Sequence, residues 1–424
     1  MKYMIDNTLK TNKKRVILAG IRIRDKSEDE FRLAMDECRA LCMACGYVVA
    51  GEIIQNSESM HPKTAFRSGK LEELTNLVNA LDADLVIFYN QLKMGTAERI
   101  SEICGVNVQD RTSLILDIFS QRARSRQAKL QTEMARLQYA LPQILNSVDE
   151  SGHQRGGAVT NRGGGEMRSE IIARKYSARI AELRKELRAI EVQRGQDERR
   201  RNKILIRRAA LVGYTNAGKS SLLNAMLEKS GGQGSRVMEK DMLFATLDTS
   251  VRMCGSGAMK YLLYDTVGFV SDLPHGLVEA FRSTLSAARE ADLLIHVIDV
   301  SDPQYVNKMH VTEDTLKQIG ADHIETLRVY NKIDKAKDTS FEGIGISCMT
   351  GEGLDKLAEE IEQRLYPQQK MIKVLLPYDK MSLFDQYRKV LSMHILENSE
   401  EGIVVEVSGP EKYVAAFRQF ERKD

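Results

Sequence analysis

Hydrophobic and polar positions change their spacing twice along this chain of 424 residues, near residues 120 and 204. In the first part, residues 14–119, short runs of aliphatic side chains alternate with segments of helical spacing. The runs VILAGIRI, YVVAGEII, DLVIFYN and SLILDIF favour strands, and helices are expected near 28–45, 67–80 and 95–104. This pattern predicts an N-terminal α/β domain over residues 1–120.

From about residue 120, apolar residues recur every three or four positions, as on one face of a helix. Two long helices with narrow apolar seams are expected, paired antiparallel as a hairpin over residues 121–203. The seams are Leu130, Met134, Leu137, Leu141, Ile144 and Val148, then Ile172, Tyr176, Ile180, Leu183, Leu187 and Ile190. The glycine-rich stretch between them, ESGHQRGGAVTNRGGGE, has almost nothing apolar and is expected to be an exposed tip.

Residues 204–366 return to alternation of strands and helices. The expected strands are KILIRRAALVG, KYLLYDTV, DLLIHVIDV, TLRVYNKID and IGISC, with helices from Lys219, near 276–289, near 307–319 and from Gly353. Strands joined by crossover helices predict a mostly parallel, doubly wound sheet, so the fold class is α/β. Residues 367–424 are predicted to form a small C-terminal α/β domain with strands IKVLL and GIVVEVSG and two helices.

Composition narrows the class of protein. No long apolar run or secretory leader occurs, so a cytoplasmic location without a membrane span is expected. The six cysteines fit reduced thiols. Cys38, Cys42 and Cys45 fall on one helix face, but no fourth ligand lies nearby in sequence, so packing is favoured over a metal site.

Charge is distributed unevenly. Residues 121–208 hold 21 Lys and Arg against 10 Asp and Glu, a local excess of +11, whereas the whole chain has a net charge of +3 and the rest therefore sums to −8. A solvated helix face accounts for mixed charges but not for so large an excess of one sign. The asymmetry favours a nucleic acid as the partner of the hairpin.

The segment GYTNAGKS, Gly213–Ser220, matches the phosphate loop G-x-x-x-x-G-K-[ST] between a predicted strand and a predicted helix. In such a loop, backbone N–H groups surround the phosphates, Lys219 adds a charge on the β- and γ-phosphates, and the Ser220 hydroxyl ligates Mg²⁺. The residues expected to contact the nucleotide here are Gly213, Tyr214, Thr215, Asn216, Ala217, Gly218, Lys219, Ser220 and Ser221.

A second motif, DTVG, comprises Asp265, Thr266, Val267 and Gly268. Asp265 is placed to hold Mg²⁺ through water, and the Gly268 N–H can bond the γ-phosphate, whose loss would release the loop. Upstream, DMLFATLDTS offers Thr246 as the second hydroxyl on Mg²⁺, with Thr249 as the alternative. Phe269 follows the motif where one common mechanism keeps a water-orienting glutamine, so other groups must assist hydrolysis.

A third motif, NKID, predicts which base is bound. Asp334 can accept hydrogen bonds from N1–H and from the exocyclic amine of guanine, whereas adenine would leave the carboxylate unpaired. Asn331 can brace the loop and donate toward N7, and the Lys332 stem can cover the base plane. GTP is therefore predicted over ATP.

The chain resembles the Obg-HflX group of P-loop GTPases and, outside the G domain, the HflX family. The similar stretches include SGKLEEL, VQDRTSLILDIFSQRARSRQAKLQTEMARLQYALP, LFATLD and DTVGFVSDLPHGLVEAFRSTL. The resemblance implies a GTPase that binds the large ribosomal subunit and its rRNA, with the hairpin reaching toward the peptidyl-transferase region, and that splits ribosomes during stress. It also implies a guanine loop at Ser347, Cys348 and Met349, in which Ser347 braces Asp334 and a backbone N–H reaches the guanine O6.

Three stretches depart from the family pattern. NRGGGEMRSE stands where a Gly-Pro-Gly-Glu-Thr-Gln type sequence is usual, Cys348 replaces an alanine, and no proline follows Asp248. The first departure bears on the contacts of the tip loop with RNA. The change at Cys348 is expected to matter little, because a backbone N–H makes the contact there, and the missing proline bears on the first switch.

Several groups are candidates for assisting GTP hydrolysis. Besides Lys219, Thr246 and Gly268, Asn216 occupies a place where some GTPases hold a monovalent cation, so K⁺ is a candidate cofactor beside Mg²⁺. The ribosome could instead order the loops, and His275 is a weaker candidate as water positioner. A monomer is expected. Alternative functions are a ribosome assembly or hibernation factor, or an RNA-binding scaffold with a structural nucleotide.

Overall fold

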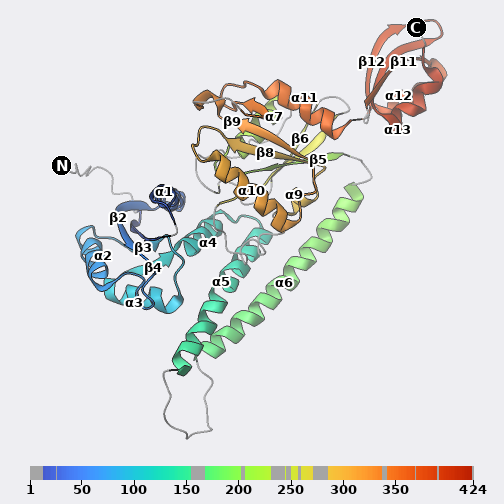
Figure 1. The fold of residues 1–424 in the computed structure, drawn as a ribbon. Coiled ribbons are helices and arrows are strands. Elements are labelled where there is room, and N and C mark those ends of the chain that lie inside the picture. Colours follow the sequence, from blue (N-terminus) through green and yellow to red (C-terminus); the bar gives the residue numbers. More distant parts are fainter. Residues whose placement is uncertain are drawn as a thin grey trace. The chain divides into compact units, whose positions relative to one another are not determined.

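The computed structural model describes residues 13–24, 26–153, 168–201, 206–230, 244, 250–255, 259–270, 285–336, 341–367, 369–388 and 391–422 (Figure 1). The chain divides into two compact units. The first comprises Met1–Gly195, Asp241–Leu247 and Asp272–Phe281, and the second comprises the remaining segments, Gln196–Lys240, Asp248–Ser271 and Arg282–Asp424. The four-part domain division drawn from the sequence stays a prediction.

The first unit begins with a four-stranded parallel sheet of order β2-β1-β3-β4. Alternate side chains of the central strand β1, Ile17, Ala19 and Ile21, face the helices that follow β2 and β3. Gly20 faces the opposite way, where an added Cβ would lie 2.6 Å from the Met35 sulfur in the first helix. The elements are β1 (Arg15–Ile23), α1 (Glu28–Ala44), β2 (Val48–Ser57), α2 (Ser68–Ala80), β3 (Leu85–Phe88), α3 (Met94–Cys104) and β4 (Asn107–Asp110).

The run SLILDIF is helical, so its prediction as a strand is wrong. It lies in α4 (Arg111–Arg122), which Asp110 caps by accepting a hydrogen bond from the Ser113 N–H over 2.9 Å. Both faces of this helix are covered, since Leu114, Ile115 and Leu116 are all buried. A helix buried on all sides loses its periodicity and resembles a buried strand in sequence.

Two long helices follow, α5 (Arg126–His153) and α6 (Arg168–Arg201), and they lie side by side in Figure 1. Two ion pairs between the helices confirm the predicted antiparallel pairing. They join Arg126 to Glu186 at 3.0 Å and Arg179 to Glu133 at 2.8 Å. Among the predicted seam residues whose side chains are described, Leu130, Met134, Ile144, Ile180, Leu183 and Leu187 are buried. Tyr139 and Arg136 of α5 contact Asp110 and Asp117 in the preceding α/β part.

The second unit contains a six-stranded sheet of order β10-β9-β8-β5-β7-β6. All its pairs are parallel except β6 with β7, as expected for a doubly wound sheet with one antiparallel edge strand. Its elements are β5 (Arg207–Val212), α7 (Lys219–Lys229), β6 (Ser250–Cys254), β7 (Tyr261–Asp265), α9 (Ser286–Arg289), β8 (Leu293–Asp299), α10 (Tyr305–Ile319), β9 (Thr326–Asn331), β10 (Ile344–Ile346) and α11 (Leu354–Leu365).

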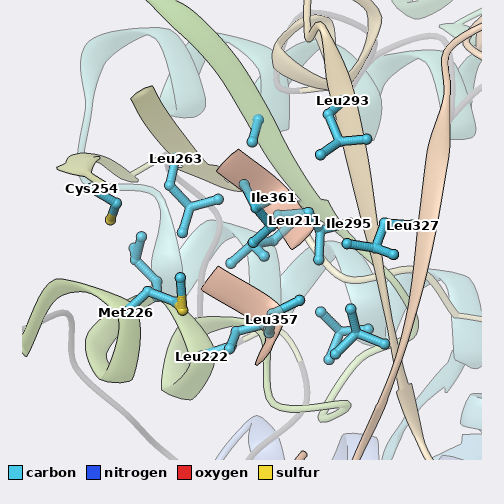
Figure 2. Close-up of a cluster of buried hydrophobic side chains, with 14 of the residues drawn as sticks. Leu211, Leu222, Met226, Cys254, Leu263, Leu293, Ile295, Leu327, Leu357 and Ile361 are labelled. Atoms are coloured by element: carbon cyan, nitrogen blue, oxygen red, sulfur yellow. The ribbon is translucent and has the colours of Figure 1, made fainter. Parts of the chain in front are cut away.

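The core of this sheet lies under α7 and α11 (Figure 2). Leu211 and Ile295 of the central strands pack there with Leu222 of α7 and Leu357 of α11, and all four are fully buried. Ile298 points to the opposite face, toward Met309 of α10. Because β5, β7, β8 and β9 run parallel, their carboxyl ends meet at one edge, where ligands of open α/β sheets bind.

Residues 369–422 form an antiparallel sheet of order β11-β13-β12 with two short helices. Strands β11 (Gln369–Pro377) and β13 (Gly402–Pro410) contain the two predicted strands. Strand β12 (Ser392–Asn398) was not predicted, because it is a largely exposed edge strand without a clear alternation of apolar residues. The helices are α12 (Met381–Tyr387) and α13 (Glu411–Val414).

Two expectations from composition can be compared with the described part of the chain. Cys38, Cys42 and Cys45 are buried, and no group of three or more His, Cys, Asp or Glu there could hold a metal ion. A hydrogen bond with Cys38, together with burial, raises the pKa of the Cys42 thiol. Among the described helices, none is long and apolar enough to cross a membrane.

Candidate nucleotide-binding site

The loop Gly213–Ser220 connects the end of β5 to the start of α7, which is the strand–loop–helix context that the motif requires. Gly218 has φ +97°, and a Cβ there would lie 2.1 Å from the Asn331 side-chain nitrogen, so only glycine fits. Lys219 folds back over the loop, and its Nζ donates to the carbonyl oxygens of Gly213 at 3.0 Å and Tyr214 at 2.8 Å. The cation therefore lies among backbone groups that a phosphate can replace.

Lys219 is only 6% exposed. Burial lowers the pKa of its ammonium group to about 8, and the nearby Asp265 carboxylate opposes this shift. Among the described residues, no anion contacts the Lys219 ammonium group. A phosphate that binds there would stabilise the buried charge, because it replaces the water that the cation has lost.

Ser220 and Asp265 lie together, as both motifs predicted. The Ser220 hydroxyl donates to Asp265 Oδ2 over 2.6 Å, and Asp265 is fully buried at the end of β7. A hydroxyl beside a carboxylate is an all-oxygen donor set of the kind Mg²⁺ prefers, so the residues present fit this ion. The Thr266 hydroxyl donates to the Leu211 carbonyl over 2.6 Å and is fully buried. Its side chain braces β5, which leaves only its backbone available to a ligand.

The segment after Asp265 pairs with the phosphate loop. The Phe269 N–H donates to the Gly213 carbonyl over 3.1 Å, and the Phe269 carbonyl accepts from the Thr215 N–H over 2.8 Å. A Cβ on Gly268 would lie 2.8 Å from the Thr215 Cα and 2.9 Å from Lys219 Nζ, so glycine permits this close approach. Phe269 is 2% exposed and carries no polar group, so it cannot orient water.

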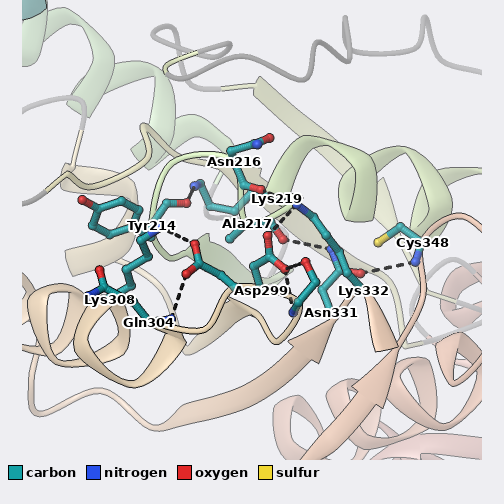
Figure 3. A network of polar contacts seen from close by, with 12 residues as sticks. Tyr214, Asn216, Ala217, Lys219, Asp299, Gln304, Lys308, Asn331, Lys332 and Cys348 are labelled. Atoms are coloured by element: carbon teal, nitrogen blue, oxygen red, sulfur yellow. Dashed lines mark hydrogen bonds and ion pairs between the residues drawn. The ribbon is translucent and has the colours of Figure 1, made fainter. Parts of the chain in front are cut away.

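The base-recognition motif lies beside the phosphate loop (Figure 3). Asn331 is buried at the end of β9, its Nδ2 donates to the Ala217 carbonyl over 2.9 Å, and its Oδ1 accepts from the Cys348 N–H over 3.3 Å. Asn331 thus joins the phosphate loop to the loop after β10. Asp334 lies in the short 3₁₀ turn Ile333–Lys335 that follows.

The loop after β10 differs from the expectation at one residue. Ser347 is fully buried, but its hydroxyl accepts from the Thr350 N–H over 3.2 Å, and no bond to Asp334 is found among the described residues. Ser347 closes the turn of its own loop rather than bracing Asp334. Cys348 is half-buried, and Met349 is 84% exposed.

The remaining phosphate-loop residues have distinct environments. Asn216 has φ +64° and an exposed side chain, and its carbonyl accepts from Lys332 Nζ over 3.0 Å. The Thr215 hydroxyl is buried without a hydrogen-bond partner among the described residues and is therefore available to a ligand. Ser221 is half-buried in the first turn of α7.

Several predicted residues lie outside the described ones: Thr246 and its alternative Thr249, Asp248, His275, and the glycine-rich tip 154–167. Phe244 is described, with φ +55° and 2% exposure. Within the first compact unit, its ring packs edge-to-face on Phe119 of α4 at a centroid distance of 4.6 Å.

No motif in the sequence points to two carboxylates at the carboxyl end of β8, Asp299 and Asp302. Asp299 contacts Lys332, and Asp302 contacts Lys308, whose Nζ lies 5.0 Å from the centroid of the Tyr214 ring (Figure 3). The available signal was the position of Asp299 at the carboxyl end of a central strand, on the same sheet edge as Val212, Asp265 and Asn331.

Comparisons with known families agree with this geometry. Residues 32–120 match the family described as GTP-binding GTPase N-terminal, residues 122–201 match GTP-binding GTPase Middle Region, and residues 208–332 match 50S ribosome-binding GTPase. A crystal structure of SsGBP with GDP is 26% identical, with a TM-score of 0.47, and covers 83% of this chain and 98% of its own.

The similarity to curated proteins extends over nearly the whole chain. The GTPase HflX of Caldanaerobacter subterraneus subsp. tengcongensis is 38% identical, with 94% of this chain and 91% of that protein covered. The GTPase HflX of Lacrimispora saccharolytica is 35% identical, with 96% of each chain covered. Given this similarity and the joined phosphate and base loops, the chain belongs to the HflX family of GTPases and hydrolyses GTP.

Proposed function

We propose that this GTPase binds the large ribosomal subunit through its basic hairpin, that the bound nucleotide controls this binding, and that the protein splits ribosomes into subunits during stress. Two observations from the similar proteins support the ribosomal partner. The family matched by residues 208–332 is described as 50S ribosome-binding, and the two curated relatives described above carry the HflX name. Ribosomes lie in the cytoplasm, so we place its action there, as a monomer.

The observation that carries the proposal is the cationic outer face of α6. Its buried positions Ile180, Leu183 and Leu187 face α5, whereas Arg184, Lys185 and Arg188 between and after them are exposed. No ion pair involves these three cations within the described part of the hairpin. Unpaired cations along a rigid helix are suited to phosphate contacts with RNA, whose affinity they supply through counterion release.

Arg179 has a different role. Its guanidinium donates to both Glu133 oxygens, at 2.8 and 3.1 Å, and to Glu182 at 2.7 Å. These contacts neutralise the charge within the hairpin and cross-link α5 to α6. Arg179 therefore stabilises the arm, and the RNA contacts are assigned to Arg184, Lys185 and Arg188.

The nucleotide site supports GTP hydrolysis by positioning and charge. Lys219 would exchange the Gly213 and Tyr214 carbonyls for phosphate oxygens, and Asp334 would distinguish guanine from adenine. Ser220 and Asp265 would hold Mg²⁺, which neutralises charge on the phosphates when bound. The Gly268 N–H would bond the γ-phosphate, so loss of that phosphate would alter the segment that pairs with the phosphate loop.

Because Phe269 cannot orient the attacking water, another group must assist hydrolysis. We propose K⁺ beside Asn216 as that group, because a cation there would neutralise charge in the transition state as an arginine finger does, a role worth roughly 10³ to 10⁵ in rate. The positive φ of Asn216 and its exposed side chain support access from solvent. Turnover in K⁺ is expected to exceed turnover in Na⁺ at equal ionic strength, and equal rates would remove this role.

The function is tested by sucrose-gradient sedimentation of 70S ribosomes with the full chain in GTP, GDP and a non-hydrolysable GTP analogue. Conversion of 70S particles into subunits with GTP or the analogue, but not with GDP, is expected. Nucleotide-dependent binding without conversion would favour an assembly or hibernation factor. Equal binding with GDP and the analogue would favour a scaffold with a structural nucleotide.

A further inference from the structure

Asp299, the last residue of β8, contacts the lysine of the base-recognition motif. Lys332 Nζ donates to Asp299 Oδ2 over 2.6 Å and to the Asn216 carbonyl over 3.0 Å, as the dashed lines in Figure 3 show. The Asp299 side chain is 18% exposed and the Lys332 side chain 24% exposed. A charge-assisted bond this short and this shielded from water is among the stronger hydrogen bonds in proteins.

The Asp299 carboxylate is held in place without the lysine. Its Oδ1 accepts from the Ser301 hydroxyl over 2.6 Å and from the Ser301 N–H over 3.0 Å. One carboxylate oxygen is therefore fixed by the turn after β8, and the other is directed at Lys332. This division makes Asp299 a rigid anchor for a flexible side chain.

Lys332 needs such an anchor. Its backbone lies in the left-handed region, with φ +66°, and a 3₁₀ turn begins directly after it. A free lysine side chain loses about 2 kcal/mol of rotamer entropy when it is ordered. With its ammonium end held by Asp299 and Asn216, the aliphatic stem spans the space between β9 and the phosphate loop before any ligand arrives. A base that packs on this stem does not bear the ordering cost.

We propose that Asp299 is a positioning residue for nucleotide affinity, which acts on the purine ring only through Lys332. This role is distinct from that of Asp334, because a stem that covers the ring plane contacts any purine equally, whereas a carboxylate at the ring edge distinguishes among them. The proposed role also implies that Asp299 stabilises the ground state and the transition state of hydrolysis equally. The effect then appears in KM and not in kcat.

A double-mutant cycle on the full-length protein tests this role, with Asp299→Asn, Lys332→Met and the combined variant. The Kd for GDP and the KM and kcat for GTP are measured. Asp299→Asn is expected to raise Kd and KM about tenfold and to leave kcat within about twofold. In the Lys332→Met background, the same substitution is expected to change nothing further, because its route to the base has been removed.

Inosine nucleotides, which lack the exocyclic amine, provide a second readout. Asp299→Asn is expected to weaken GDP and IDP by the same factor, so their affinity ratio stays at the wild-type value. Asp334→Asn is expected to change that ratio. A general disturbance of the base loop would instead raise the Kd values and also change the ratio of GDP to IDP affinity.

A matched control exists at the other end of the same strand. Asp292 precedes β8, pairs with Arg207 at 2.8 Å and accepts from the Arg208 N–H over 2.8 Å. Asp292→Asn removes one carboxylate charge from the same strand and is expected to leave Kd and KM unchanged. If Asp299→Asn folds poorly, Ser301→Ala loosens the carboxylate and is expected to give a smaller rise in KM, again abolished by Lys332→Met.

Two outcomes would overturn the proposal. One is a rise in Kd that is equally large with and without Lys332, because Asp299 would then act independently of the lysine. The other is a loss of kcat at unchanged KM. All these measurements use free GTP, GDP and IDP and are unaffected by whether the protein acts on ribosomes.

Discussion

Ser220 in the phosphate loop donates a hydrogen bond to Asp265 over 2.6 Å, although the two residues lie 45 positions apart in the chain. The sheet order produces this contact, because β5 and β7 are neighbours and their parallel pairing brings Leu211 opposite Asp265. The start of α7 and the end of β7 therefore meet at one edge of the sheet. Two oxygen donors of the kind that Mg²⁺ prefers therefore lie together at this edge.

Removal of the Ser220 hydroxyl is expected to weaken Mg²⁺ binding in the nucleotide complex. Ser220→Ala deletes one oxygen donor, so the Mg²⁺ concentration for half-maximal GTP turnover is expected to rise about tenfold or more. Turnover measured over a Mg²⁺ titration tests this. Ser230→Ala, at the end of the same helix, removes a hydroxyl that bonds the Met226 carbonyl and should leave the titration unchanged. A wild-type titration curve for Ser220→Ala would exclude this role.

Nucleotide affinity is expected to depend on the protonation of Lys219. Burial lowers its pKa to about 8, and phosphates in contact would raise the pKa again. The protonated form binds phosphate better, so affinity for GDP should fall as pH rises through about 8, by up to about tenfold per pH unit. Titration calorimetry from pH 7.5 to 9, in buffers of different ionisation enthalpy, should detect proton uptake on binding.

Lys219→Arg supplies the control for this dependence. Arginine stays charged throughout the range, so the variant should bind more weakly at neutral pH but with a nearly flat pH profile. A profile of wild-type slope in the arginine variant would assign the dependence to another group.

His296 is expected to limit stability in acid. It is 1% exposed in the middle of β8, and burial lowers its pKa to about 4 from an ordinary 6.5. Between these values the unfolded chain binds more protons than the folded one, so stability is full above about pH 6.5 and is lost as pH falls toward 4. The loss is at most about 3 kcal/mol.

His296→Leu should remove this contribution. In urea unfolding followed from pH 7 to 4.5, the variant is expected to gain stability relative to wild type as pH falls. His323→Gln, at an exposed position of the same unit, should track the wild type. A wild-type slope in His296→Leu would show that other groups determine the acid transition.

Charge reversal on the outer face of α6 should weaken binding to the large subunit. With Arg184, Lys185 and Arg188 changed to glutamate, the affinity is expected to fall at least tenfold at moderate salt, and the slope of log affinity against log salt to become shallower by about two. Basal GTP turnover should stay at the wild-type rate. Unaltered affinity would exclude the outer face of α6 as the docking surface.

Arg179→Glu provides the contrast on the same helix. It removes the bonds to Glu133 and places a like charge there, so it should lower the thermal stability of the hairpin. Circular dichroism during heating tests this. A stable Arg179→Glu variant with weakened subunit binding would place Arg179 among the RNA contacts.

Much of the nucleotide site could be predicted because its motifs are local. Glycine at 218, Lys219 and Ser220 follow from the geometry that a phosphate imposes on a short loop, and the order of the three motifs fixed the strands that carry them. The antiparallel hairpin was likewise predictable, because its seams repeat every three or four residues.

Features that depend on distant partners could not be predicted. Thr266 bonds β5 because its hydroxyl is buried beside the Leu211 carbonyl, 55 residues away in the chain, which only the folded sheet brings near. The same holds for Asp299, whose partner Lys332 lies 33 residues away. Helix α4 was mistaken for a strand because its apolar residues are covered on several sides and its period disappears.

We propose above that the nucleotide bound in this site controls whether the hairpin binds the large ribosomal subunit. Asp334→Asn tests it most directly, because an amide at this position should exchange the preference for guanine for one for xanthine, whose oxygen at C2 accepts a hydrogen bond. Equilibrium binding of this variant to purified large subunits is measured with non-hydrolysable GTP and XTP analogues and with XDP. If the nucleotide controls subunit binding, the variant is expected to bind tightly with the XTP analogue and weakly with XDP and with the GTP analogue. Equal affinity under all three conditions would contradict it.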